Sequence, residues 1–238
     1  MSRPSAADGS AAGSPVDPPE VWPVLGIRLT TADLLLRPAV GDDVLALGAI
    51  VPDDLELDPA SARFDVTEGA NRRAAIAQGI WRNWGIWTAE SWNLPFTVVH
   101  DGVVVGSQNL EGDRFGVVRT VDTSSWLVSS VRRRGFGRQM RTAVLTLAFD
   151  HLGAEAAITA AWRDNHSSLG VSRRLGYTAN GLELHPRLER GDRARDEMLH
   201  LRITRQEWLN RDHLPVTVVG VAGCLPFFGV HDPTPPSN

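Results

Sequence analysis

The chain has 238 residues, of which 42% are hydrophobic and 22% are charged, a balance typical of globular proteins rather than of disordered or fibrous ones. Its formal net charge of -4, from 24 basic and 28 acidic side chains, gives no overall positive field, so nucleic acid is not expected as a partner. Cys224 is the single cysteine and no Cys/His set has metal-ligand spacing, so we expect a cytoplasmic location, no internal disulfide and no metal.

The first segments in chain order are a leader, a strand and a helix. Residues 1–23 are rich in Ser, Ala, Gly and Pro and lack the apolar core of a secretory signal, which predicts a disordered leader. Leu34–Pro38 is a short apolar run closed by proline, as in a strand that ends in a turn. Asp42 and Asp43 then occupy helix-capping positions, so a helix is expected to continue to about Ile50.

A second helix is expected from Asn71, as its cap, to about Trp92, because apolar residues recur there at helical spacing. Half of the eight tryptophans lie in this segment. They are Trp81, Trp84, Trp87 and Trp92. A cluster this dense either fills a core or walls a ligand groove, and we favour core packing because aromatic stripes usually have that role.

Two apolar runs separated by Asp101-Gly102 form the clearest hairpin in the sequence. The first run is residues 96–100 and the second is residues 103–106. A further strand, at about residues 117–128, contains β-branched residues and leads directly into a run of arginines.

The remaining pattern returns to a helix, which is expected from Gly135 to about Leu152 because Phe136, Met140 and Val144 share one face. The elements that follow are a buried strand at residues 156–161, a helix at 167–175, and strands at 177–184 and 197–203, with a charged loop at 186–195.

Strands and helices alternate along the chain, but the hairpin and the final strand pair predict a mixed sheet rather than a fully parallel one. The predicted fold class is therefore α/β, with one domain over residues 24–212. A C-terminal extension, residues 213–238, follows, and its end from Pro233 is predicted to be disordered. Its apolar stretch, residues 216–230, is too short and too interrupted by glycine and proline to span a bilayer, so no membrane association is expected.

The junction between the strand at 117–128 and the next helix has the chemistry of an anion site. A strand, a glycine-containing turn and a helix N-terminus point backbone N–H groups at one spot, with the positive end of the helix dipole behind them. Gly135 and Gly137 let the main chain approach a phosphate. Five arginines add positive charge, namely Arg132, Arg133, Arg134, Arg138 and Arg141.

The glycine spacing restricts the anion. The segment lacks the Gly-Lys-Ser/Thr ending of a P-loop and the third glycine of the dinucleotide fingerprint. An exposed arginine turn that only starts a helix has the same short pattern, and it is the structural alternative to a phosphate loop.

The spacing Arg132-x-x-Gly135-x-Gly137 resembles the Gln/Arg-x-x-Gly-x-Gly/Ala motif of the GNAT superfamily of acyltransferases, at the strand-to-helix junction where that family carries it. Further segments in the family's order extend the resemblance over residues 28–209. They are Leu34–Pro38 with Asp42-Asp43, similar to the opening of the RimJ/RimL-type branch; Trp126-Leu127-Val128, similar to its splayed central strand; Asn165-x-x-Ser168 with Leu175-Gly176-Tyr177, similar to its late motif; and Asp196–Trp208, similar to its closing strand and tail.

The resemblance implies a GNAT fold with splayed central strands and helices on the sheet, and acyl-CoA as co-substrate. It implies direct transfer of an acyl group, most simply acetyl, to a primary amine of a small molecule or a protein N-terminus, in a ternary complex. A homo-oligomer is compatible with it. The CoA-binding residues that it implies are Leu127 and Val128 for the pantetheine, Arg132, Arg133, Arg134, Gly135, Phe136, Gly137 and Arg138 for the pyrophosphate, and Asn165 with Ser168 beside the pantetheine arm.

Ser168 is the candidate acid for the departing thiolate, because it matches the serine of the family's Asn-x-x-Ser motif. Many GNAT enzymes carry a tyrosine acid at a position that is Ser172 here, and Tyr177, the only tyrosine, is expected to pack in the core. The backbone N–H of Val128 is the candidate for stabilising the oxyanion.

Asp122 is the candidate base for the amine, at a central-strand position where RimL-like sequences often carry glutamate. Glu111 and Asp113 are alternatives, and each of the three carboxylates has a purely structural or surface role as its alternative. The charged loop at 187–195 and the helix containing Trp81–Trp92 are expected to border the acceptor.

Other functions remain open from the sequence. Some RimJ/RimL-type enzymes use succinyl-CoA, and an arginine near the thioester would favour its carboxylate, with Arg82 and Arg114 as candidates. A non-catalytic CoA-binding module would keep the loop without using the acid and base. A nucleotide-binding protein is disfavoured by the glycine pattern and by the absence of a magnesium-ligand signature.

Overall fold

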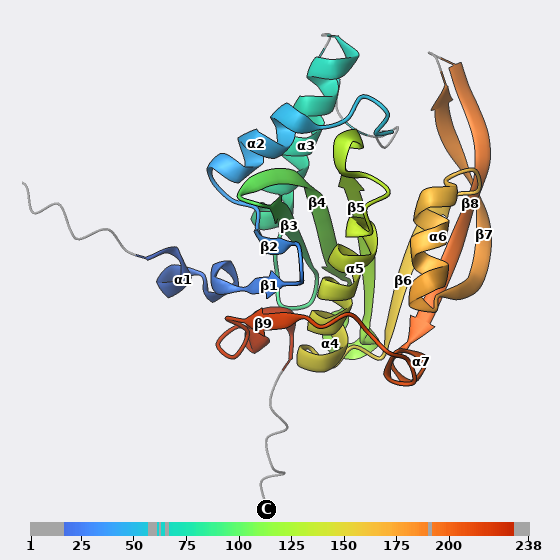
Figure 1. The fold of residues 1–238 in the computed structure, drawn as a ribbon. Coiled ribbons are helices and arrows are strands. Elements are labelled where there is room, and N and C mark those ends of the chain that lie inside the picture. The colour runs from blue at the N-terminus through green and yellow to red at the C-terminus, as the bar shows by residue number, and fades with distance from the viewer. Residues whose placement is uncertain (1–16, 57–60, 62, 65–66, 190–191, 231–238) are drawn as a thin grey trace, which may run out of the picture.

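The predicted strands join into one mixed sheet in the computed structural model of the protein, which describes residues 17–56, 61, 63–64, 67–189 and 192–230 (Figure 1). Nine strands follow the order β7-β8-β6-β5-β4-β3-β2-β1-β9. Their bounds are β1 Arg28–Thr30, β2 Leu35–Pro38, β3 Trp92–His100, β4 Val103–Gly112, β5 Thr120–Leu127, β6 Ala156–Trp162, β7 Thr178–Glu189, β8 Asp192–Thr204 and β9 Thr217–Val219. The mixed-sheet α/β prediction is thereby confirmed.

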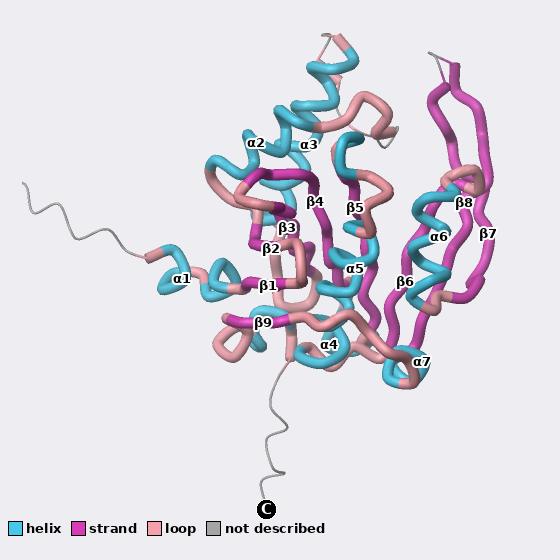
Figure 2. Tube along the Cα trace, in the orientation of Figure 1, coloured by secondary structure: helices cyan, strands magenta, loops and turns pink. Residues whose placement is uncertain are grey.

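Helices cover both faces of this sheet (Figure 2). The helical segments are α1 Pro18–Val21, η1 Pro23–Gly26, α2 Asp42–Ile50, α3 Glu68–Gly85, α4 Phe115–Val118, η2 Ser129–Val131, α5 Phe136–Thr146, η3 Leu147–His151, α6 His166–Leu175, α7 Arg205–Leu209 and η4 Leu225–Phe228. The main core packs α5 against the sheet, and a smaller cluster joins α2 and α3 to Val104 and Trp126. Trp126 and Leu127 are adjacent in β5 yet belong to different clusters, as expected for side chains that alternate between two faces.

The strands β5 and β6 form a parallel pair that soon separates. Thr120, Val121 and Asp122 pair with residues 156–158, and every other strand pairing in the described sheet is antiparallel. Beyond Asp122, β5 continues along β4 and β6 continues along β8 without pairing with each other. One edge of β5 is therefore left without a strand partner, directly before the arginine and glycine loop.

The predicted hairpin is confirmed as β3 and β4. Asp101 and Gly102 both have positive φ, 48° and 77°, the backbone conformation that a two-residue turn with the twist of the strands requires. This left-handed region is accessible to glycine without steric cost, which explains the residue type at position 102.

Helix α3 differs from its prediction at both ends. Thr67 is the cap, because its side chain accepts a hydrogen bond from the N–H of Ala70, and Asn71 is buried inside the helix. The helix ends at Gly85, so Trp87 and Trp92 lie beyond it and their rings stack with centroids 5.9 Å apart. Similarly, Asp43 does not cap α2 but forms an ion pair with Arg37 at 2.8 Å.

The predicted charged loop at residues 186–195 is wrong, because the ladder between β7 and β8 continues to the pair Glu189 and Asp192. Pro186 does not interrupt it. A proline has no N–H to donate, but β7 is the edge strand of the sheet and one side of it needs no partner. The charged segment is thus a long hairpin, seen at one side of the molecule in Figure 1.

Residues on both sides of the predicted domain, 24–212, pack against it. Residues 17–23 include helix α1, and Trp22 packs edge-to-face against Trp87 and Phe227, so this part of the predicted leader is structured. Beyond residue 212, β9 pairs with β1, while Cys224 and Phe228 are fully buried in the main core. The described part of the extension, up to residue 230, therefore shares the core of the predicted domain, and the predicted disorder at 1–16 and 233–238 lies outside the described residues.

Candidate active site

The loop between β5 and α5 has the backbone geometry of an anion cradle. Gly135 caps α5 in the left-handed conformation, with φ at 86°, and the first N–H groups of a helix lack intrahelical partners. A Cβ added to Gly135 would meet nothing within 4 Å, and one added to Gly137 would meet only a methyl of Val171, at 3.4 Å. The protein's own packing therefore leaves the space above both glycines open to a ligand.

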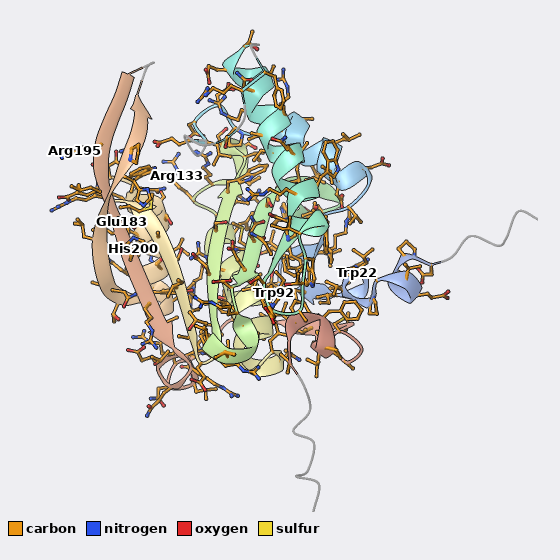
Figure 3. The ribbon with its side chains drawn as sticks, turned by 180° about the vertical axis from the view of Figure 1, so that it is seen from behind. Trp22, Trp92, Arg133, Glu183, Arg195 and His200 are labelled. Atoms are coloured by element: carbon orange, nitrogen blue, oxygen red, sulfur yellow. The ribbon has the colours of Figure 1, made fainter. Side chains whose placement is uncertain are left out.

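A cavity of about 590 Å³ runs from this loop between α5, α6 and the free edge of β5. It brings together most of the CoA-binding residues predicted from the sequence, which are Leu127, Arg132, Arg133, Gly135, Gly137, Arg138, Asn165 and Ser168. Figure 3 shows Arg133 facing the space between the β7–β8 hairpin and the rest of the sheet. Segments that are more than 40 residues apart in the chain thus line one cavity.

The other three residues predicted to bind CoA do not line this cavity. Phe136, the first residue of α5, is buried, with 3% of its surface exposed. The Arg134 guanidinium lies over the Phe136 ring, 4.8 Å from its centroid, and 3.4 Å from His100 Nε2. Val128 does not line the cavity, and its N–H donates to the carbonyl of Val105 at 2.9 Å.

The bond from Val128 to β4 also decides which backbone groups of β5 face the cavity. In an antiparallel ladder, successive residues direct their N–H groups to opposite edges of the strand. Val128 is therefore not available to an oxyanion, whereas the N–H groups of Leu127 and Ser125 point toward the side where β6 has diverged. Both residues line the cavity.

Asp54, Leu55 and Glu56, which follow α2, line the cavity, and two of them bind arginines. Arg132 donates from its two terminal nitrogens to Asp54, and from Nε to the carbonyl of Leu127 at 2.9 Å. The hydrogen bond from Arg132 lowers the pKa of Asp54 below its ordinary value. Glu56 accepts two hydrogen bonds from Arg187 of β7, from Nε at 3.0 Å and from a terminal nitrogen at 2.6 Å.

We predict that Asp54→Asn strengthens CoA binding roughly two- to fivefold, because it removes a carboxylate that competes with phosphate for Arg132 in an exposed pair. Calorimetric titration with CoA at low and high salt checks this. Asp53→Asn is the control, since Asp53 pairs with Arg72 instead of with the loop. Weaker CoA binding by the Asp54 variant would show that Asp54 positions Arg132 instead of competing for it.

The first turn of α6 is fixed by Asn165. Its side-chain oxygen accepts a hydrogen bond from the N–H of Ser168 at 3.0 Å, which caps the helix. Ser168 lines the cavity, whereas Ser172 is fully buried and its hydroxyl donates to the carbonyl of Ser168. Tyr177 is buried as expected, and burial raises the pKa of its hydroxyl.

Asp122 is the last residue of β5 that pairs with β6, at the point of divergence. Its side chain lies on the opposite face from the buried Val121 and Thr123, and it does not line the CoA cavity. Solvent reaches this carboxyl, but protein surrounds it closely enough that desolvation raises its pKa to about 6. The cross-strand carboxylate of Glu111 adds to the increase, and the N–H of Thr123 opposes it.

The other carboxylates suit a base less well. Glu111 Oε2 accepts a hydrogen bond from Asn93 Nδ2 at 2.8 Å. Asp113 accepts one from Ser91 Oγ at 2.6 Å, which lowers its pKa and so weakens it as a base.

Arg82 and Arg114, the two arginines considered for an acyl carboxylate, do not line the cavity. Arg141 does line it, although its sequence context predicts only a further positive charge near the glycine and arginine loop. The pattern that could have identified Arg141 is its place on the buried face of α5, four residues after Gly137.

Fold and site together define the class of protein: an α/β protein with diverging central strands and a glycine- and arginine-containing loop at the start of the helix between them. Residues 33–178 match the family model for the acetyltransferase (GNAT) domain, which is more than half of the chain. The chain therefore belongs to the GNAT acetyltransferase family, whose members use acyl-CoA.

Solved structures of the same fold have low sequence identity to the chain. RimJ of Mycobacterium smegmatis, in complex with CoA-disulfide, is 21% identical with a TM-score of 0.59, over 80% of this chain and 91% of that one. A GNAT-family acetyltransferase from Bacillus anthracis is 15% identical, TM-score 0.57, over 75% and 99%. A GCN5-related N-acetyltransferase from Brucella melitensis is 17% identical, TM-score 0.55, over 76% and 80%.

Two further observations are confined to the described residues. No group of three or more His, Cys, Asp or Glu side chains is arranged to hold a metal ion. None of the helices there is both long enough and apolar enough to cross a membrane.

Proposed function

We propose that the protein is a RimJ/RimL-type N-acyltransferase that moves an acyl group from acyl-CoA directly to a primary amine. The observation that carries this proposal is the single cavity that joins the glycine and arginine loop, the free edge of β5 and the first turn of α6. These are the three surfaces that a pyrophosphate, an extended pantetheine amide chain and a departing thiolate need.

Binding of the CoA thioester would use groups of the loop and of the free edge of β5. The N-terminal N–H groups of α5, with Arg133 and Arg138, would hold the pyrophosphate. The free edge of β5 would pair with the pantetheine amides through Leu127 and Ser125, as an added strand does. The thioester would then lie deeper along β5, near its divergence from β6.

The chemistry needs a neutral amine and a proton for the leaving group. The amine nitrogen attacks the thioester carbon, the new C–N bond forms, and the C–S bond breaks as the electron pair leaves on sulfur. Asp122, with its raised pKa, would accept the amine's proton directly or through water. Ser168 would donate a proton to the thiolate from the opposite side of the sheet.

We assign the acceptor to the side of the β7–β8 hairpin. A second cavity, of about 360 Å³, lies there against Pro186, Arg187 and Trp162, and against Glu68 and Arg72 of α3. We assign the N-terminal part of α3 to the acceptor side instead of the predicted tryptophan segment, because Trp84 of α3 and Trp87 and Trp92 beyond it pack in the core. Core packing, the interpretation favoured from the sequence, is confirmed for those three.

Thermal denaturation with acetyl-CoA, succinyl-CoA, ATP and NAD in turn tests the proposal, since a ligand that binds the native state raises the midpoint. We expect both CoA esters to raise it and the two nucleotides to leave it unchanged. Thiol release with a panel of polyamines and peptide N-termini then separates an enzyme from a CoA-binding module. No shift with either ester would refute the proposal.

Ser168→Ala is expected to lower kcat about tenfold at pH 7 and to leave the Kd for CoA unchanged. The loss is modest because a thiol pKa near 8.5 allows water to protonate much of the leaving thiolate. Alanine keeps the backbone N–H that Asn165 caps, so α6 should persist. Single-turnover rates measure the effect, with Ser168→Cys as the variant that retains a proton donor. An unchanged rate would remove Ser168 as the acid.

A further inference from the structure

Arg141 is a buried cation whose hydrogen-bonding capacity is largely unused. Only 3% of its surface is exposed. Its terminal nitrogens have two long contacts with neutral hydroxyls, 3.3 Å to Thr159 Oγ1 and 3.4 Å to Ser125 Oγ, and its Nε has no partner among the described residues. A guanidinium has five N–H donors and remains charged in proteins.

Leaving such a charge without a close anion costs far more than leaving a neutral polar group without a partner. Arg141 forms no ion pair with any of the described residues. By contrast, Arg132 pairs with Asp54 and Arg187 pairs with Glu56. The hydroxyl of Tyr177, which also lies near Arg141, is a further neutral group, because burial raises its pKa, so it brings no negative charge to the guanidinium. This end of the cavity is therefore built to receive a negatively charged group.

The position of Arg141 indicates which group that is. It lies four residues after Gly137, so it is about one turn further along the same face of α5, away from the phosphate loop. Its contact residue Ser125 lies two residues before Leu127 on β5, in the same direction. Arg141 lines the same cavity as the loop, so a CoA whose pyrophosphate sits at the helix start and whose pantetheine follows β5 brings its acyl end to Arg141.

We infer that Arg141 binds a carboxylate at the far end of the acyl chain, and hence that the donor is a dicarboxylic acyl-CoA such as succinyl-CoA. The inference rests on the proposed function, because it takes the cavity as the CoA site. An acetyl group carries no negative charge, so it would leave the Arg141 guanidinium without an anionic partner. A succinyl carboxylate accepts two N–H bonds from the planar guanidinium.

Succinyl-CoA and butyryl-CoA are the matched pair of ligands for the test, because they have the same chain length and differ in a carboxylate for a methyl group. We expect wild-type protein to prefer succinyl-CoA by roughly tenfold or more in Kd and in kcat/KM, the range of a charge-assisted hydrogen bond. Arg141→Met keeps the length of the side chain and should erase this ratio while CoA itself binds within about threefold of wild type. Arg141→Lys should restore part of the preference.

Arg138→Ala is the control variant, since it should weaken succinyl-CoA and butyryl-CoA equally and leave their ratio unchanged. An equal affinity of wild type for the two esters would overturn the inference. So would an unchanged ratio in Arg141→Met, or an equal loss for all CoA ligands in that variant, which would place Arg141 on the shared thioester instead. If Arg141→Met does not fold, the wild-type ratio and Arg141→Lys decide alone. Failure of the proposed function looks different, because then no CoA ester binds.

Discussion

Arg138→Glu is expected to weaken CoA binding about 100-fold while the protein remains folded. Arg138 lies in the first turn of α5 and lines the cavity, where it would form charge-assisted hydrogen bonds with the pyrophosphate. The substitution removes these bonds and adds repulsion between like charges, together about 3 kcal/mol or more. A glutamate near a helix N-terminus interacts favourably with the helix dipole, so α5 should be preserved. Calorimetric titration measures the loss.

Arg134→Glu is the matched control because it makes the same charge change four residues earlier in the chain. The Arg134 side chain lies against Phe136 and His100, outside the cavity. We expect its effect on the CoA Kd to stay within about threefold, the long-range share of one charge at moderate ionic strength. Equal losses for the two variants would show that the loop acts only through its total charge, against the assignment of individual arginines.

Asp122→Asn is expected to lower kcat roughly 100-fold or more, the usual range for loss of a general base, with little change in CoA affinity. Asparagine has nearly the same shape and keeps an oxygen for the N–H of Thr123. Steady-state rates with a saturating acyl-CoA measure the effect. A rate within threefold of wild type would assign Asp122 a structural role and leave Glu111 as the candidate base.

The pH dependence of kcat/KM distinguishes these two carboxylates. The base acts when it is deprotonated, so wild-type activity should rise with pH through about 6, the raised pKa of Asp122. Glu111→Gln removes a neighbouring negative charge that raises this pKa, so its profile should shift toward lower pH while the maximal rate is retained. If the rising part of the pH profile stays at the same pH in Glu111→Gln, the assignment of Asp122 as the base is contradicted.

The same raised pKa has a consequence for folding stability. Since the folded-state pKa lies above the unfolded value, Asp122 favours the folded state when protonated, and this contribution is lost as pH rises through about 6. Asp122→Asn should therefore raise the thermal midpoint relative to wild type at pH 8 but not at pH 4. Denaturation scans at the two pH values check the sign.

Elements with a contiguous signature could be predicted from the sequence. The Asp101-Gly102 turn, flanked by alternating apolar residues, specified the β3–β4 hairpin because both the turn conformation and the strand period are local properties. The glycine and arginine loop was recognisable for the same reason. The end of α3 and the loop at 186–195 were misjudged, because Trp87 and Trp92 continue an apolar pattern beyond the helix and because an edge strand tolerates Pro186.

The candidate site could be predicted only in part. The sequence identified the loop and the late motif, and the tertiary structure places Arg132, Gly137 and Ser168 around one cavity. The sequence could not identify the roles of Ser125 and Arg141, because these roles depend on a helix packing against a strand that is distant along the chain. The sequence also could not show that the segments before residue 24 and after residue 212 pack into the same core.

The sequence by itself determined that this protein has a mixed α/β sheet, and it predicted an anion-binding loop and indicated the GNAT family. Only the tertiary structure decided how β5 separates from β6, which arginines face the cavity, and that Arg134 turns away while Arg141 is buried inside it. The physical reason is that a residue type fixes the charge and length of a side chain, whereas its direction and the cost of its burial are set by the elements packed around it.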